Sequence, residues 1–135
     1  MTALFLDASV LIARADTEDP EHDASRLLLA ADTSIATLDL AFYEVTNVAV
    51  RWHDPAAARS LRTWVAAIAR DGELMRIDET LVAAAADLAQ EHGLSAYDAA
   101  YVAGAAAVGA PLVSCDVRDL VRPGHALSPT QALAT

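Results

Sequence analysis

Residues 95–116 read SAYDAAYVAGAAAVGAPLVSCD, and this stretch carries the clearest fold signal in the chain. Ala, Val, Gly and Leu dominate it, which is typical of a buried helix over 96–108 followed by a buried strand over 111–115. Asp98 falls in the first turn of this helix, and Asp116 directly follows the strand. Carboxylates at both edges of such an apolar segment need an explanation, either structural or chemical.

The rest of the chain alternates short apolar runs with longer amphipathic segments. The runs predict further buried strands over 3–6, 33–37 and 73–77, with 125–129 as the candidate for a fifth strand at the sheet edge. The amphipathic segments predict helices over 8–15, 20–32, 40–53, 56–70 and 79–92. Strands of this kind, alternating with helices, are typical of a parallel sheet covered on both faces. We therefore expect a three-layer α/β/α sandwich with a mostly parallel sheet of four to five strands, formed as one domain by residues 1–135.

The composition narrows the class of protein. Of the 135 residues, 55% are hydrophobic and 21% are charged, which indicates a folded chain rather than a disordered one. No apolar run reaches the roughly 18 to 20 residues of a membrane span, and the first residues lack the basic region of a signal peptide. The single cysteine, Cys115, lies in an apolar strand and fits a reducing compartment. We expect a cytoplasmic protein without a membrane segment.

The net charge of −10 gives no sign of the basic face that most nucleic-acid-binding proteins present. An acidic surface can instead serve solubility, suit a salty cytoplasm or fit a basic protein partner. All nine basic residues are arginines, so any contact with a phosphate falls to arginine. Each arginine near the expected site can instead be an ordinary solvated residue or a salt-bridge partner. The candidates for phosphate contacts are Arg14, Arg51, Arg118 and Arg122.

Four acids from distant parts of the chain are expected at one edge of the sheet. Ligands bind an open parallel sheet outside the carboxyl ends of its strands. Asp7 and Asp116 each follow a predicted strand, and Asp98 begins the helix that leads into the last of these strands. Glu44 lies one to two turns into its helix and borders an inward-facing stripe. Two like charges 4 Å apart repel by about 4 kcal/mol at an effective dielectric near 20, so such a cluster would either raise the pKa values of its acids or recruit a divalent cation.

Taken singly, most of these acids also have a structural explanation. Asp7 can cap the helix over 8–15, Ser95 and Asp98 have the spacing of a capping box, and Asp116 can start a turn. By the same reasoning, Asp39 is expected to cap the helix over 40–53. Glu44 is harder to explain in this way, because a carboxylate beside an apolar stripe is unfavourable unless it is paired or bound to a metal.

Four segments resemble the motifs of the PIN-domain family, and specifically those of the VapC toxins of bacterial and archaeal toxin–antitoxin pairs. They follow the family's order along essentially the whole chain, and they are FLDASVLI (5–12), YEVTN (43–47), LSAYDAAYVAGA (94–105) and APLVSCDVRDL (110–120). The resemblance implies a metal-dependent ribonuclease that cleaves single-stranded regions of tRNA, rRNA or mRNA. It also implies a homodimer that is inhibited by a cognate VapB-type antitoxin.

The resemblance assigns roles to particular residues. The catalytic acids that would hold one or two Mg²⁺ or Mn²⁺ ions are Asp7, Glu44, Asp98 and Asp116. Hard oxygen ligands of this kind suit these ions better than zinc. The side chains expected to support the acids are Ser9, Asn47 and Ser114. Asp119 either joins the metal site or caps its own turn, and we favour the cap.

Two other functions compete with this interpretation. A phosphoaspartate receiver domain also gathers acids at strand ends, but it needs a lysine, and the chain has none. A PIN-fold module that acts in RNA processing or RNA binding, outside a toxin–antitoxin pair, stays open as the alternative. The aromatic residues are expected in the core or in an interface rather than stacked on bases: Trp52, Trp64, Tyr97 and Tyr101.

Overall fold

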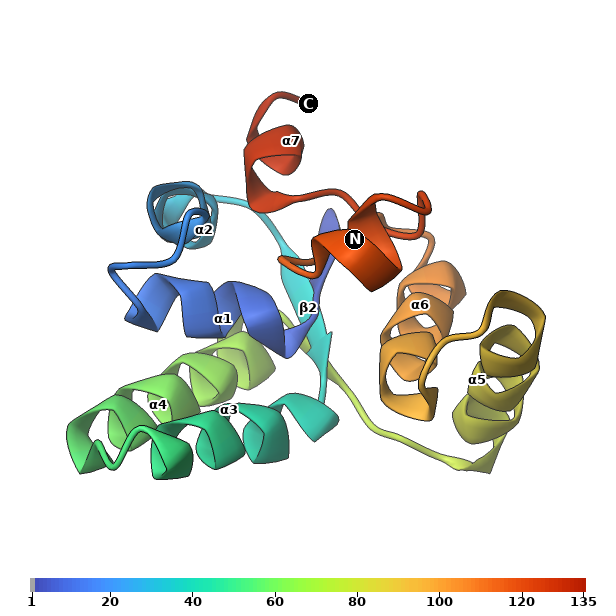
Figure 1. Ribbon diagram of the computed structural model, residues 1–135, viewed down its shortest axis with the longest axis horizontal. Coiled ribbons are helices and arrows are strands. Elements are labelled where there is room, and N and C mark those ends of the chain that lie inside the picture. Colours follow the sequence, from blue (N-terminus) through green and yellow to red (C-terminus); the bar gives the residue numbers. More distant parts are fainter. Residues whose placement is uncertain (1) are drawn as a thin grey trace.

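The computed structural model describes residues 2–135 and is built on a parallel four-stranded sheet (Figure 1). The strands are β1 (Leu4–Leu6), β2 (Ile35–Leu38), β3 (Glu73–Met75) and β4 (Leu112–Val113). They lie in the order β3-β2-β1-β4, and each neighbouring pair is parallel. The expected mostly parallel sheet of four to five strands is confirmed.

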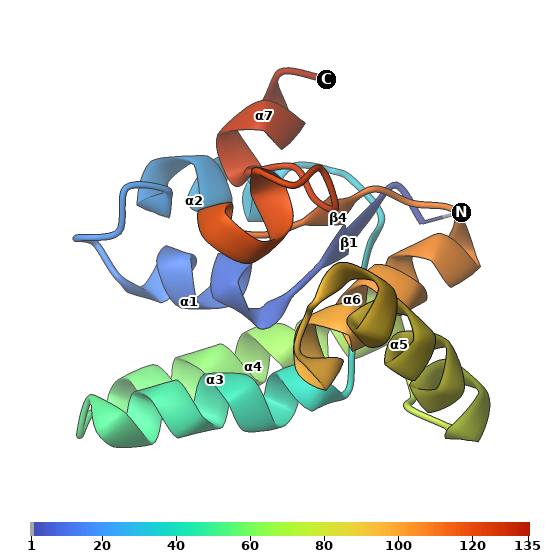
Figure 2. The same cartoon turned by 45° about the vertical axis from the view of Figure 1, so that its right-hand side comes forward.

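Helices cover both faces of this sheet. In chain order they are α1 (Ala8–Ala15), α2 (His22–Ala30), α3 (Leu40–Arg51), α4 (Pro55–Asp71), α5 (Glu79–His92), α6 (Ala96–Val108), the π-helical turn η1 (Val117–Val121) and α7 (Pro129–Leu133). Figures 1 and 2 show α1 to α4 on one side of the sheet and α5 with α6 on the other. Among the described residues, no helix is both long and apolar enough to cross a membrane.

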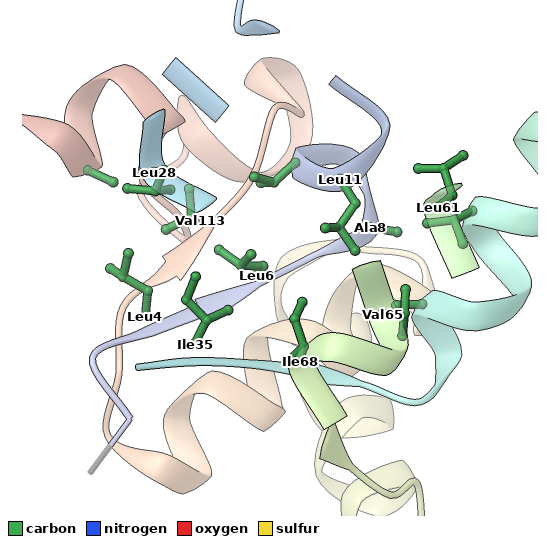
Figure 3. Close-up of a cluster of buried hydrophobic side chains, with 14 of the residues drawn as sticks. Leu4, Leu6, Ala8, Leu11, Leu28, Ile35, Leu61, Val65, Ile68 and Val113 are labelled. Carbon is green, nitrogen blue, oxygen red and sulfur yellow. The ribbon is translucent and has the colours of Figure 1, made fainter. Parts of the chain in front are cut away.

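The alternation of side chains along β1 divides the core in two. Leu4 and Leu6 point into a cluster with α1 to α4, which includes Leu11 and Val65 (Figure 3). Phe5 points the opposite way, into a cluster with α5 and α6. Successive strand residues face opposite sides of a sheet, so a strand covered on both faces is apolar at most positions. This explains why β1 and β4 are continuous apolar runs.

Most helix boundaries follow from local chemistry. Gly93 and Gly109 end α5 and α6 in the left-handed conformation with φ of 69°, which glycine adopts without strain. Asp39 is an exception, since its side chain does not cap α3. Its backbone is already helical rather than extended, so its carboxylate instead accepts from the N–H of Ile77, at 3.3 Å. The expectation that Asp39 caps this helix is wrong.

The C-terminal segment differs from the expected fifth strand over 125–129. Only a single parallel bridge forms, between Val113 and Leu127. Ser128 and Gln131 form a capping box, and Pro129 occupies the first turn of α7. These helix-starting signals end the extended segment before it can become a strand.

Gly104 allows α6 to pack closely against the sheet, so a larger residue at this position should destabilise the fold. A Cβ at this position would lie 2.7 Å from Cζ of Phe5 and 3.2 Å from Cδ2 of Leu38, both fully buried. Overpacking of a core costs about 1–3 kcal/mol, which outweighs the gain of up to about 1 kcal/mol from alanine's higher helix propensity. Gly104→Ala should therefore lower the free energy of unfolding in urea by about 1 kcal/mol. Exposed Ala106→Ser is the control and should change it by less than about 0.5 kcal/mol, while an equal or more stable Gly104→Ala would contradict this packing argument.

Candidate metal centre

The carboxyl ends of β1 and β4 lead into the candidate site. Asp7 directly follows β1 and caps α1 by accepting from the N–H of Ser9 at 2.9 Å. Asp116 follows β4 by three residues and caps η1 by accepting from the N–H of Asp119 at 3.0 Å. The structural explanation and the functional one are thus compatible, because each carboxylate has a second oxygen besides the one that caps.

Asp7, Glu44, Asp98 and Asp116 line one cavity of about 210 Å³. The first and last come from strand ends, Glu44 from the middle of α3, and Asp98 from the first turn of α6. The structure therefore brings together the four acids that lie up to 109 positions apart in the sequence. The other residues that line the cavity are Ala8, Ser9, Ile12, Asn47, Val48, Arg51 and Tyr101.

Two serines connect the acids at the two strand ends. The hydroxyl of Ser9 donates to Asp7 and accepts from the N–H of Cys115 at 2.8 Å. The hydroxyl of Ser114 lies 3.4 Å from that of Ser9 and accepts from the N–H of Asp116 at 3.0 Å. Ser114 is completely buried, so these contacts hold the ends of β1 and β4 at a defined distance from each other.

The carboxylate of Asp119 lies close to two of the candidate metal ligands, Asp98 and Asp116, and does not only stabilise its own turn. Single carboxylate oxygens of Asp98, Asp116 and Asp119 lie within 4.8 Å of one another. The favoured expectation for Asp119 does not hold, because the carboxylate that caps η1 is that of Asp116. Asp119 lies in the first turn of η1, and its carboxylate lies close to that of Asp98. The other contact of Asp119 is with Arg118, whose Nε lies 3.1 Å from its Oδ1.

Burial and mutual repulsion make Asp7, Glu44 and Asp98 hard to ionise without a cation. Burial raises the pKa of Asp7 to about 6, although hydrogen bonds from Ser114 and Ser9 oppose the shift. Burial also raises the pKa of Glu44, and the negative charge of Asp98 adds to this. The pKa of Asp98 is raised by burial and then by the charges of Asp116 and Asp119. A bound cation would remove most of this cost.

The arginines expected near the acids lie in different places. Arg51, in the last turn of α3, lines the cavity. Arg118 is paired with Asp119 and its side chain is 84% exposed, and Arg122 is exposed at the end of η1. Arg14 does not reach the acids, since its guanidinium lies 4.1 Å from the ring centre of Trp64, at a separate cavity of about 290 Å³. Its position on α1 points its long side chain toward α4, where the cation can stack on an aromatic ring.

The aromatic residues fall into two groups. Trp64 packs against the first core cluster and Tyr101 is 2% exposed, as expected for core residues. Tyr97 is 64% exposed and Trp52 is 38% exposed, so neither is a core residue. Sequence reasoning missed that the hydroxyl of Tyr101 donates to Oε1 of Glu44 at 2.6 Å. The available signal was its spacing, three residues after Asp98, which puts both side chains on one face of α6.

The fold and the site together agree with a known family. The sequence model of the PIN domain family matches residues 4–124, which is most of the chain. The chain belongs to the PIN domain family. This confirms the resemblance seen in the four sequence motifs, and it places the acid-lined cavity of this PIN domain within a fold shared with other members. No curated protein sequence matches this PIN domain.

Several solved structures share the fold of this PIN domain. VapC20 of Mycobacterium tuberculosis, described as a toxin that cleaves the sarcin–ricin loop, has a TM-score of 0.75 at 21% identity, over 90% of this chain and 95% of its own. A toxin–antitoxin complex from Klebsiella pneumoniae has a TM-score of 0.69 at 21% identity, over 95% of this chain and 98% of its own. VapBC2 of Rickettsia felis, bound to a DNA fragment from its promoter, has a TM-score of 0.63 at 13% identity, over 94% and 97% of the two chains.

Proposed function

We propose that this PIN domain is a metal-dependent endoribonuclease of the VapC type, the toxin of a toxin–antitoxin pair. The observation that carries the proposal is the convergence of Asp7, Glu44, Asp98 and Asp116 on one cavity at the carboxyl edge of the sheet. Family membership supports nuclease chemistry at this position. The alternative, a PIN-fold RNA-processing module outside a toxin–antitoxin pair, would use the same site.

The donor set suits Mg²⁺ or Mn²⁺. The candidate ligands are all carboxylates, which are the hard oxygen donors that these ions prefer, and no histidine lines the cavity. The oxygens of Asp98, Asp116 and Asp119 within 4.8 Å of one another are the tightest group of such donors among the described residues. We assign ion binding to these three acids together with Asp7 and Glu44.

The chain's own residues would prepare the site for hydrolysis of a phosphodiester. When bound, the ion supplies positive charge against the developing transition-state charge and lowers the pKa of a water molecule. The hydroxyl of Ser9 holds the carboxylate of Asp7 and the N–H of Asp119 holds that of Asp116, so these oxygens need little rearrangement on binding. Asn47 and Arg51 line the same cavity and are candidates to contact the substrate, with Arg51 offering a bidentate fork for a phosphate.

RNA is the proposed substrate. The support is indirect, namely family membership and the likeness in fold to a toxin described as cleaving an rRNA loop. The net charge of −10 requires that binding rely on the ion and on a few arginines rather than on a basic face. Arg118 can take part only if a phosphate displaces its contact with Asp119. These features favour a short, single-stranded segment over a long duplex.

A basic antitoxin is the proposed protein partner, and a homodimer is the proposed assembly. The acidic charge complements a basic inhibitor, and similar folds occur in toxin–antitoxin complexes. Tyr43 and Val50 are 80% and 62% exposed and lie seven residues apart on α3, so they share an apolar face that a second copy could cover. A cytoplasmic location is consistent with an RNA substrate.

Incubation of the purified protein with a mixture of cellular RNA tests this function. We expect cleavage at defined positions with Mn²⁺ or Mg²⁺ and none with EDTA, and sequencing of the new ends would identify the target. The matched control is Asp87→Asn, which removes an exposed acid of α5 and should cleave as the wild type does. Cleavage that persists unchanged in EDTA, or that is absent with every RNA and both ions, would contradict the proposal.

A further inference from the structure

The hydroxyl of Tyr101 connects three helices directly beneath the acids. Tyr101 belongs to the core cluster under α5 and α6 and is only 2% exposed, yet it lines the acid cavity. Its hydroxyl donates to Oε1 of Glu44 on α3 at 2.6 Å. The backbone of Ala8, the first residue of α1, lies close to the same hydroxyl. This hydroxyl thus links α6 to α3, next to the residue that follows Asp7.

Burial and electrostatic repulsion disfavour the position of the Glu44 carboxylate at the cavity wall. It is partly buried, and the negative charges of Asp7 and Asp98 lie close enough to repel it. A glutamate side chain has three rotatable bonds, so without a restraint it would turn toward solvent and away from these charges. The bond from Tyr101 is the only hydrogen bond that the Glu44 side chain makes within residues 2–135.

The alternative is that Glu44 serves Tyr101, by satisfying a hydroxyl that the core would otherwise leave unpaired. That solution is costly, because desolvating a carboxylate costs more than leaving a hydroxyl without a partner. The hydroxyl also has the backbone of Ala8 as a neighbour. The contact is better explained if it benefits Glu44, whose second oxygen, Oε2, stays available to the cavity.

We propose that Tyr101 is a positioning residue, which holds the Glu44 carboxylate on the cavity wall so that one of its oxygens can bind the ion. This role rests on the proposed metal-dependent function, and it adds to the site a residue that is not one of the acids. Tyr101 acts only through Glu44. Removing its hydroxyl should therefore matter only when Glu44 is present.

Mn²⁺ binding measured by calorimetry in four proteins tests this coupling. They are the wild type, Tyr101→Phe, Glu44→Gln and the double variant. Tyr101→Phe should weaken Mn²⁺ binding about 10-fold in the wild-type background, as is typical when a partner of a metal ligand is removed, and change it little in the Glu44→Gln background. Tyr43→Phe is the matched control, since it removes the hydroxyl of an 80% exposed tyrosine beside Glu44 and should leave binding unchanged. An equal loss in both backgrounds, or no loss in either, would overturn the proposal.

A crystal structure of metal-free Tyr101→Phe gives a result that does not depend on the ion. We expect an unchanged backbone with the Glu44 side chain turned out of the cavity. Glu44 in its original position would overturn the proposal, and so would a variant that does not fold, because the hydroxyl would then have a structural role. If the wild type binds no Mn²⁺, the proposed nuclease function fails, while this structure still decides whether Tyr101 positions Glu44.

Discussion

Replacing Asp98 with asparagine is expected to lower RNA cleavage about 100- to 1000-fold, which is the usual cost of removing a group that stabilises transition-state charge. Asp98 interacts with acids on both sides of it. Its negative charge acts on Glu44, and its carboxylate also lies close to those of Asp116 and Asp119. Asparagine has the same shape and keeps a neutral oxygen donor, but it lacks the negative charge. The measurement is the initial rate of RNA cleavage with Mn²⁺, together with growth after induced expression, which the variant should no longer arrest.

The fold of Asp98→Asn should survive, so loss of activity can be separated from loss of structure. The backbone N–H of residue 98 still donates to Oγ of Ser95, at 3.0 Å in the wild type, because the side chain takes no part in this cap. Removing one charge also relieves the repulsion from Asp116 and Asp119, so the metal-free variant should unfold at the same temperature as the wild type or higher. A folded variant that still cleaves RNA and arrests growth would show that another site is responsible.

The metal-free protein is expected to lose stability as the pH rises from about 4 to about 6. Burial raises the pKa of Asp7 from 3.8 in the unfolded chain to about 6 in the folded one. In this window the folded state therefore binds more protons than the unfolded state, and stability falls as the pH rises. The difference in pKa corresponds to about 3 kcal/mol for this group alone, and the raised pKa values of Glu44 and Asp98 act in the same direction.

Urea unfolding in EDTA between pH 4 and pH 8 measures this effect. Asp7→Asn should match the wild type near pH 4, exceed its stability at pH 8, and show a smaller loss over the interval. Asp87→Asn, at an exposed position on α5, should keep the full pH dependence. At pH 8, Mn²⁺ at 100 times its dissociation constant should add about 2.7 kcal/mol to the wild type. A wild type whose stability rises between pH 4 and pH 6, or an Asp7→Asn variant that is less stable at pH 8, would be inconsistent with a strained acid cluster.

The sequence predicts that the acids after β1 and β4 meet, because the direction of the chain determines at which edge of a parallel sheet each strand ends. Parallel strands expose their carboxyl ends at one edge, so acids that directly follow apolar runs, such as Asp7 and Asp116, must meet there. Glu44 was identifiable as an acid beside an apolar helical stripe, which is unfavourable without a partner. These inferences need only the periodicity of the chain and its direction.

The side-chain contacts that could not be predicted from the sequence depend on tertiary packing, which no local sequence pattern encodes. The grouping of Asp119 with Asp98 depends on how the π-helical turn follows its capped first residue. The bond between Tyr101 and Glu44 depends on how α6 packs against α3, over 57 positions of chain. Arg14 lies near Asp7 in sequence, yet its side chain extends to Trp64 instead of the acids. In each case, tertiary packing decides which neighbours a side chain can reach.

Anomalous diffraction from a crystal soaked in Mn²⁺ would show whether the four acids hold a divalent cation, because it locates the ion without reference to activity. We expect a peak in the cavity lined by Asp7, Glu44, Asp98 and Asp116, on the side where the carboxylate of Asp119 lies close to those of Asp98 and Asp116. The same crystal form of Asp98→Asn should lose this peak or show it much weakened. A cavity without manganese at millimolar concentration, or a peak only on a remote surface, would contradict the claim that these acids gather to hold a divalent cation.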